Sequence, residues 1–172
     1  MWWWLGVAGT MKAPRRSCSL DRGPAAGLIG AHHRWSAVCK RVAMATWDDV
    51  RRIALALPET SERVSGDLHQ WRVRDKLIVW ERPLRRADLE ALGDRAPHGP
   101  ILGGRVEHLG AKEALLASDE GVFFTTPHFD GYAAILVRLD RITVPDLDEV
   151  IVEAWLARAP KRLVKAYVDK SL

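Results

Sequence analysis

Apolar residues recur at helical spacing soon after residue 45, with charged residues between them. One side of the predicted helix carries Trp47, Val50, Ala54 and Leu57. Thr46 precedes this stretch and Asp49 follows three residues later, which is the spacing of a capping box with aspartate in place of the usual glutamate. Because Pro58 disfavours helical backbone at the residue before it, the helix is predicted to end at Leu57.

Later segments have the composition of β-strands. Strands are predicted over residues 68–73, 77–81, 105–109, 122–125 and 132–139. The first two are joined near Asp75 and Lys76, and a two-residue turn there would place Trp71 opposite Trp80 on one face of the hairpin. The last strand is almost entirely apolar, which is typical of a central strand covered on both faces.

Further helices are predicted over 84–92, over 111–117, from Pro145 to a break at Pro160, and over 161–169. In the helix that begins at Pro145, Trp155 lies on the same side as the apolar residues Leu147, Ile151 and Ala154, so we expect it to be a core residue. The order of elements is α-β-β-(α)-β-α-β-β-α-α. This order predicts a single α+β domain from about residue 45 to the end.

The positive charge of the chain lies at its start. Residues 1–43 carry a net charge of +6 and the remaining residues carry −2, so the overall charge of +4 comes from the first quarter. Residues 1–43 show no helix or strand period, and Met44, Ala45 and Thr46 look like a second beginning. We therefore expect 1–43 to be a disordered basic extension or the product of an upstream translation start, and 44–172 to be the folded domain.

Composition and motifs exclude several classes of protein. No run of about 18 apolar residues could span a membrane. Cys18 and Cys39 are too few for a disulfide scaffold or a four-thiolate zinc site. The pair Gly103 and Gly104 lacks the lysine and helix that follow a phosphate-binding loop. We expect a cytoplasmic protein that is not an enzyme and that holds no metal or cofactor.

The sequence His128-Phe129-Asp130-Gly131 is the most suggestive local group. A histidine and an aspartate two residues apart, with Glu81 or His108 nearby, could begin a metal site or an acid–base pair. A turn between the last two strands explains the same residues more simply, because Asp-Gly is a common turn dipeptide and proline precedes the group.

Several short blocks, in the right order, resemble the YjbR/MmcQ family. They are WDDVR at 47–51, ALPET at 56–60, WRVRDK at 71–76, GVFFTTPH at 121–128, AW at 154–155 and APKR at 159–162. The resemblance covers residues 45–165 and implies a CyaY-like fold, a mainly antiparallel five-stranded sheet with helices packed on one side. Two features depart from the family: Asp75 stands where many relatives have glycine, and 81–104 is long. Members are commonly labelled DNA-binding, from a double-wing arrangement of hairpins.

Two basic groups are the candidate DNA contacts under this resemblance. One group contains Arg158, Lys161, Arg162 and Lys165, and the other contains Arg82, Arg85 and Arg86. A solvated helix face is the more common explanation of such a group. We expect weak and largely sequence-nonspecific binding to double-stranded DNA. The alternative is a small-ligand or protein-binding module that uses a groove near Trp71, Trp80 and the His128 loop.

Overall fold

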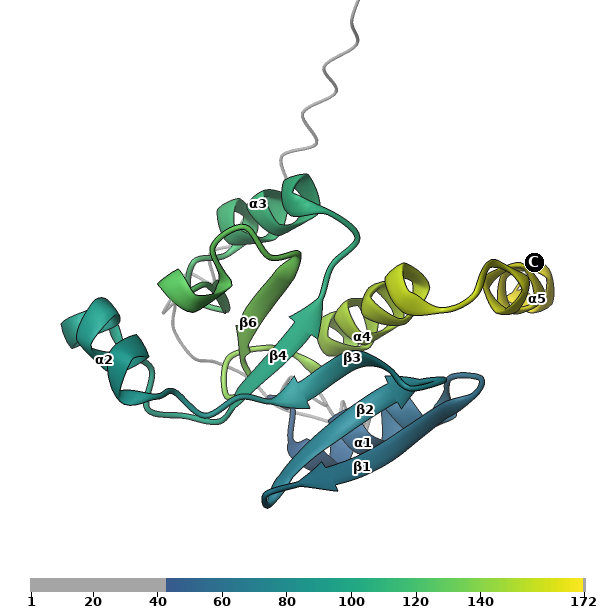
Figure 1. Cartoon of the computed structure of the whole chain (residues 1–172), viewed down its shortest axis with the longest axis horizontal. Helices are drawn as coiled ribbons and strands as arrows, with labels where there is room; N and C mark the ends of the chain where they lie inside the picture. Colours follow the sequence, from purple (N-terminus) through teal and green to yellow (C-terminus); the bar gives the residue numbers. More distant parts are fainter. Residues whose placement is uncertain (1–42, 172) are drawn as a thin grey trace, which may run out of the picture. The chain divides into compact units, whose positions relative to one another are not determined.

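Helix α1 (Trp47–Ala56) begins at the predicted capping box. A computed structural model describes residues 43–171, and the expectations for the preceding segment lie outside these residues (Figure 1). The amide of Asp49 donates to Thr46 Oγ1 at 3.3 Å, while the amide of Thr46 donates to Asp49 Oδ2 at 3.1 Å. The helix ends at Ala56, one residue before the predicted end, and Leu57 before Pro58 is its C-cap residue in extended backbone.

The sheet has six strands in the described residues, all joined by antiparallel pairs, and not the five that the sequence predicted. The strands are β1 (Thr60–Ser65), β2 (Leu68–Val73), β3 (Lys76–Glu81), β4 (Ile101–Arg105), β5 (Phe123–Phe124) and β6 (Ala134–Arg138). Their spatial order is β1-β2-β3-β4-β6-β5. Strand β1 was missed, and the strand predicted over 105–109 was wrong because β4 ends at Arg105.

The predicted pairing of two tryptophans across the β2–β3 hairpin is wrong. The register places Trp71 opposite Val79 and Trp80 opposite Gln70, with a bulge between Trp71 and Arg72. Trp71 is 1 % exposed and belongs to the core on the α1 side. Trp80 packs instead with the smaller core on the other face of the sheet. The two rings therefore do not line one groove.

Helices cover mainly one face of this sheet, as predicted. The main core lies between the sheet and helices α1, α3 (Leu109–Ser118) and α4 (Val144–Arg158). A second core on the other face contains Ile101, Phe129, Ala134 and Leu136. A single turn of 3-10 helix (Pro127–Phe129) and helix α2 (Arg86–Leu92) pack together, and Phe129 of this turn enters the second core. Strand β6 is thus buried on both faces, which explains its apolar sequence.

Helices α4 and α5 (Lys161–Ser171) meet at the predicted proline break. Trp155 of α4 is fully buried, which confirms its prediction as a core residue. Its indole Nε1 donates to the carbonyl oxygen of Pro58 at 3.1 Å, and the ring of Tyr167 from α5 lies 5.1 Å from it. Trp155 thus joins the end of α1 to both C-terminal helices. No helix in residues 43–171 has the length and apolar character needed to cross a membrane.

Candidate nucleic-acid interface

The first predicted basic group forms a patch at the junction of α4 and α5. We call Arg158, Lys161, Arg162 and Lys165 the α5 patch. Arg158 ends α4, while the other three side chains are exposed on the first turns of α5. Within the described residues, Lys161 and Lys165 form no ion pair, and Arg162 has only a contact of 3.9 Å with Glu59. The patch therefore keeps most of its positive charge uncompensated.

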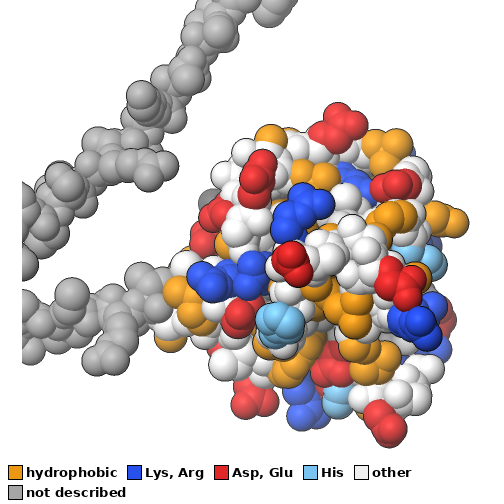
Figure 2. All heavy atoms as spheres, turned by 90° about the vertical axis from the view of Figure 1, so that its left-hand side faces the viewer, with side chains coloured by type: hydrophobic (Ala, Val, Ile, Leu, Met, Phe, Trp, Pro, Cys, Tyr) orange, Lys and Arg blue, Asp and Glu red, His pale blue; other side chains and the backbone are white. Residues whose placement is uncertain are grey.

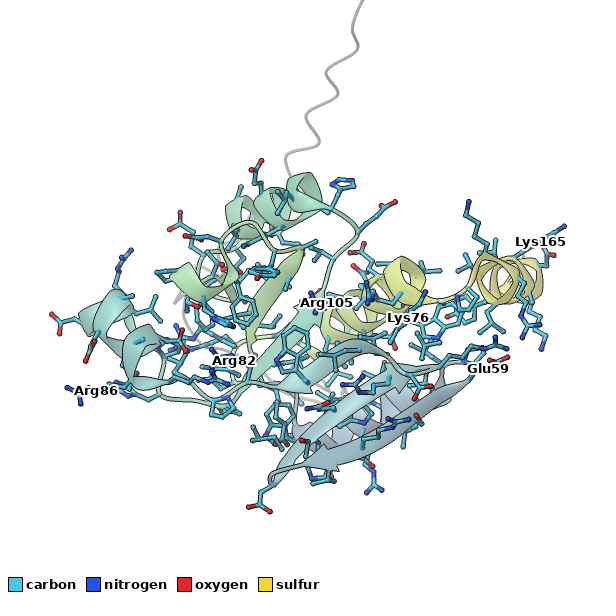
Figure 3. The ribbon with its side chains drawn as sticks, viewed as in Figure 1. Glu59, Lys76, Arg82, Arg86, Arg105 and Lys165 are labelled. Carbon is cyan, nitrogen blue, oxygen red and sulfur yellow. The ribbon has the colours of Figure 1, made fainter. Side chains whose placement is uncertain are left out.

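The β2–β3 turn adds basic residues to this end of the molecule that sequence reasoning missed. The carboxylate of Glu59 pairs with the Arg74 guanidinium as well as with Arg162. Figure 3 shows Glu59 and Lys165 at the same end of the molecule. Arg74 and the first residue of β3, Lys76, are exposed on this hairpin. Their turn position was visible in the sequence, but the contact with α5 depends on tertiary structure.

Only two of the three residues in the second predicted basic group, Arg85 and Arg86, lie at the surface. Arg82 is only 7 % exposed, and its guanidinium pairs with the buried Asp88 at 2.8 Å and lies 5.4 Å from the ring centre of Phe129. A contact between Arg82 and DNA would therefore require this pair to break, because the charge of Arg82 is used inside the protein. Arg86 pairs with Glu90 at 2.8 Å, whereas Arg85 is exposed.

This group also lies far from the α5 patch. Figure 3 places Arg86 at the opposite end from Lys165, with Arg82 between that end and the middle of the molecule. Figure 2 looks at the α2 end and shows basic and acidic side chains interspersed there. The α5 patch and the second basic group therefore do not form one continuous basic surface along which a single DNA segment could lie.

The carboxylate of Asp88 explains why Arg82 stays buried. Burial by itself would raise the pKa of Asp88, but hydrogen bonds from the Arg85 amide and the Arg82 guanidinium hold this pKa below its usual value. The Arg85 amide lies at the start of α2, so the same carboxylate also caps that helix. This cluster is structural.

The residues of the predicted His128 loop form a turn, which was the simpler of the two interpretations of this group. The 3-10 turn includes His128, whose ring meets Phe129 edge-on at 4.9 Å, and Gly131 has a positive φ of 72°. His108 instead caps α3, because the amide of Ala111 donates to its Nδ1 at 3.0 Å. Among residues 43–171, no three His, Cys, Asp or Glu side chains are grouped so that they could hold a metal ion.

The alternative function, a binding groove near Trp71, Trp80 and the His128 loop, has only one of the two tryptophans in the expected place. Trp71 lies in the main core, while Trp80 does lie beside the His128 loop, 6.2 Å from the Phe129 ring. These two aromatic rings pack against each other in the second core. A cavity of 320 Å³ occurs elsewhere, with Leu115 of α3 and Val150 of α4 among its lining residues.

Comparison with known proteins places the chain among relatives whose activity is not known. No family model matches it. The DUF419-domain protein DR2400 of Deinococcus radiodurans has the same type of fold, with a TM-score of 0.51 at 17 % identity over 74 % of this chain and 88 % of that chain. The uncharacterised proteins Rv2570 of Mycobacterium tuberculosis and Mb2600 of Mycobacterium bovis are each 56 % identical over 131 residues, covering 74 % of this chain and 99 % of theirs. The chain therefore belongs to the same family as these mycobacterial proteins.

Proposed function

We propose that this chain is a small non-enzymatic protein of YjbR/MmcQ type that acts in the cytoplasm and binds double-stranded DNA weakly, without marked sequence preference. The sequence blocks carry the resemblance, and the fold neighbour contains a DUF419 domain, which is related to YjbR-like folds. The DNA contact is the α5 patch. Arg74 and Lys76 of the β2–β3 hairpin take the place of Arg82, Arg85 and Arg86 as the second contact.

The observation that carries this proposal is an excess of positive charge around the single carboxylate of Glu59. This carboxylate serves both Arg74 and Arg162, while Lys161 and Lys165 have no ion pair in the described residues. Residues 44–172 carry a net charge of −2, so the attraction to phosphates is local to this end. Lysine and arginine side chains on a solvated helix bind phosphates and read little sequence.

The strength of this contact follows from the number of phosphates it neutralises. Four phosphate contacts give a slope of about −3.6 for log K against log salt concentration, so most binding is lost at physiological salt. The +6 segment at residues 1–43 adds its own attraction to DNA. A test must therefore separate the α5 patch from the total charge of the chain.

A pair of double charge reversals makes this separation. Lys161→Glu with Lys165→Glu changes the patch, and Arg85→Glu with Arg86→Glu makes the same change of net charge at the opposite end. Fluorescence anisotropy of a labelled duplex at low salt measures binding by the full chain. We expect the first variant to lose at least about tenfold in affinity and the second about threefold or less. Equal losses in both variants would show that only total charge matters, and the α5 patch would then be a solvated helix face.

A further inference from the structure

A cavity of 400 Å³ lies beside the last strand of the sheet. Strand β5 is an edge strand, because only β6 pairs with it in the described residues, and it is just two residues long. We call this space the β5 cavity; its lining includes Arg95, Leu116, Phe123, Phe124, Thr125 and Arg138. These residues come from the 3-10 turn after α2 (Gly93–Arg95), from α3, from β5 and the residue after it, and from β6. Segments far apart in the sequence therefore meet around one space.

The lining of the β5 cavity is largely apolar. Successive side chains of a strand point to opposite faces of a sheet. Phe123 accordingly packs with the main core and Phe124 with the second core, yet both line this cavity because it lies at the edge strand. Leu92, Pro97 and Leu116 complete the apolar part. Such a lining suits the apolar body of a small molecule, since ligand sites combine mostly apolar walls with a few polar groups.

Two buried polar atoms of the lining have no hydrogen-bond partner in the described residues. They are the Nε of Arg138 and the hydroxyl oxygen of Thr125. The Nε of Arg138 comes no closer than 3.9 Å to Asp140 Oδ1, which is too long for a hydrogen bond, and 26 % of the Arg138 side chain is exposed. Most buried polar atoms in proteins do have partners. A bound molecule with acceptor oxygens would supply them for both residues.

The charged residues of the lining favour an anion. Arg95 is exposed and forms no ion pair in residues 43–171, while Glu120 is the one carboxylate of the lining. With Arg138, the lining therefore has a net charge of +1, which a single negative charge neutralises. A guanidinium donates two parallel N–H bonds to a carboxylate, so arginine suits this group better than lysine does.

We propose that the β5 cavity binds a small organic carboxylate with an apolar body of one or two rings. Arg138 and the Thr125 hydroxyl bind the carboxylate, and Arg95 adds attraction from the surface. The rings of Phe123 and Phe124 pack against the body of the ligand. A volume of 400 Å³ is near the lower limit for ligand sites, which excludes large ligands. The site shares no residue with the α5 patch or with the β2–β3 hairpin, so it does not depend on the proposed DNA binding.

An NMR titration of the full chain with 2-naphthoate tests this site. The probe carries one carboxylate on a body of two rings, and 2-naphthylmethanol offers a similar body without the charge. Shifts of the backbone amide signals report both the Kd and the place of binding. We expect naphthoate to bind with a Kd of about 0.1–1 mM, in keeping with its size, and the alcohol to bind at least about tenfold more weakly. The amides of β5 and of the last turn of α3 should shift most.

Arginine variants of equal net charge locate the carboxylate. Arg138→Gln should weaken naphthoate binding by at least about tenfold, because it removes a hydrogen-bonded charge. Arg95→Gln should weaken it by about threefold, as the loss of an exposed ion pair does. The control is Arg141→Gln, an exposed arginine that forms no ion pair in the described residues and does not line the cavity. This control should bind naphthoate as the wild type does.

The same spectra separate lost binding from lost folding, because a folded variant keeps the dispersed amide signals of the wild type. If Arg138→Gln does not fold, the exposed Arg95→Gln still decides the outcome. The site would be overturned if naphthoate shifted no amides around β5, or if all three variants bound it as tightly as the wild type. Equal binding of naphthoate and the alcohol would also overturn it, since the carboxylate would then have no partner. Failure of the proposed function appears separately, because Lys161→Glu with Lys165→Glu should leave naphthoate binding unchanged.

Discussion

The indole ring of Trp80 lies directly against the backbone of Gly103. A β-carbon built on Gly103 would be 2.4 Å from Cε2 of that ring, closer than real atoms approach. Trp80 lies opposite Gly103 in the β3–β4 ladder, and the ring fills the space that a side chain at 103 would need. The central strand β4 thus requires glycine at position 103, where any side chain would displace the Trp80 ring.

Replacing Gly103 by alanine should therefore destabilise the protein. The ring of Trp80 cannot move freely because Phe129 and Arg105 pack against it. We expect Gly103→Ala to lower the free energy of unfolding by about 1–3 kcal/mol in urea denaturation, as overpacking of a core does. Gly104→Ala is the matched control, since its β-carbon would make ordinary contacts, the nearest at 3.6 Å from Ile135. Equal effects of the two substitutions would contradict the steric explanation.

A second prediction concerns Trp155, which is fully buried between α1 and α5. Trp155→Ala removes a large core side chain and leaves the carbonyl of Pro58 without its indole donor. We expect a loss of about 3–5 kcal/mol in the free energy of unfolding. The half-buried Trp47, on the same face, serves for comparison, and Trp47→Ala should cost clearly less. Similar losses for the two variants would show that the deeper burial of Trp155 adds nothing to the free energy of unfolding beyond what the half-buried Trp47 contributes.

Much of the fold could be predicted because its strong signals are local. The capping box at Thr46, the proline break before α5 and the apolar β6 each depend on a few neighbouring residues. Strand β1 was not predicted, because its outward side chains are polar or exposed and it therefore lacks an apolar pattern. Val64 itself is 60 % exposed. A signal was present: Gly66 and Asp67 both have positive φ and form a two-residue hairpin turn between β1 and β2.

The candidate site could be predicted only where it lies on one helix. Lys161, Arg162 and Lys165 share a turn of α5, so their spacing is enough to group them. The burial of Arg82 depends on Asp88 and on Phe129 from a distant loop, which no spacing reveals. Such a contact is a property of the assembled sheet.

A third prediction follows from the backbone of the β2–β3 turn. Arg74 and Asp75 have φ values of 44° and 63°, a region that favours glycine. Asp75→Gly relieves this strain but loses the exposed ion pair with Arg63, whereas Asp75→Ala loses the same pair and keeps the strain. We therefore expect the glycine variant to be about 1 kcal/mol more stable than the alanine variant in urea denaturation. An alanine variant as stable as the glycine variant would show that the turn relaxes to another conformation.

The last prediction concerns the buried pair of Asp88 and Arg82. Asp88→Asn leaves the Arg82 charge buried without its partner, so the free energy of unfolding at neutral pH should fall by about 3–5 kcal/mol. The control is Glu90→Gln, which breaks the exposed pair with Arg86 and should change stability by less than about 0.5 kcal/mol.

The pH dependence of this difference identifies its electrostatic origin. The pKa of Asp88 is lowered in the folded protein, so the unfolded chain takes up the proton first as the pH falls. The contribution of the ionised Asp88 is therefore complete above the unfolded pKa of about 3.9 and is lost as the pH falls below it. Asparagine does not titrate, so the stabilities of the wild type and Asp88→Asn should converge in urea melts taken at successively lower pH. A difference that stays constant down to the folded pKa would mean that the loss comes from packing and not from the charge of Asp88.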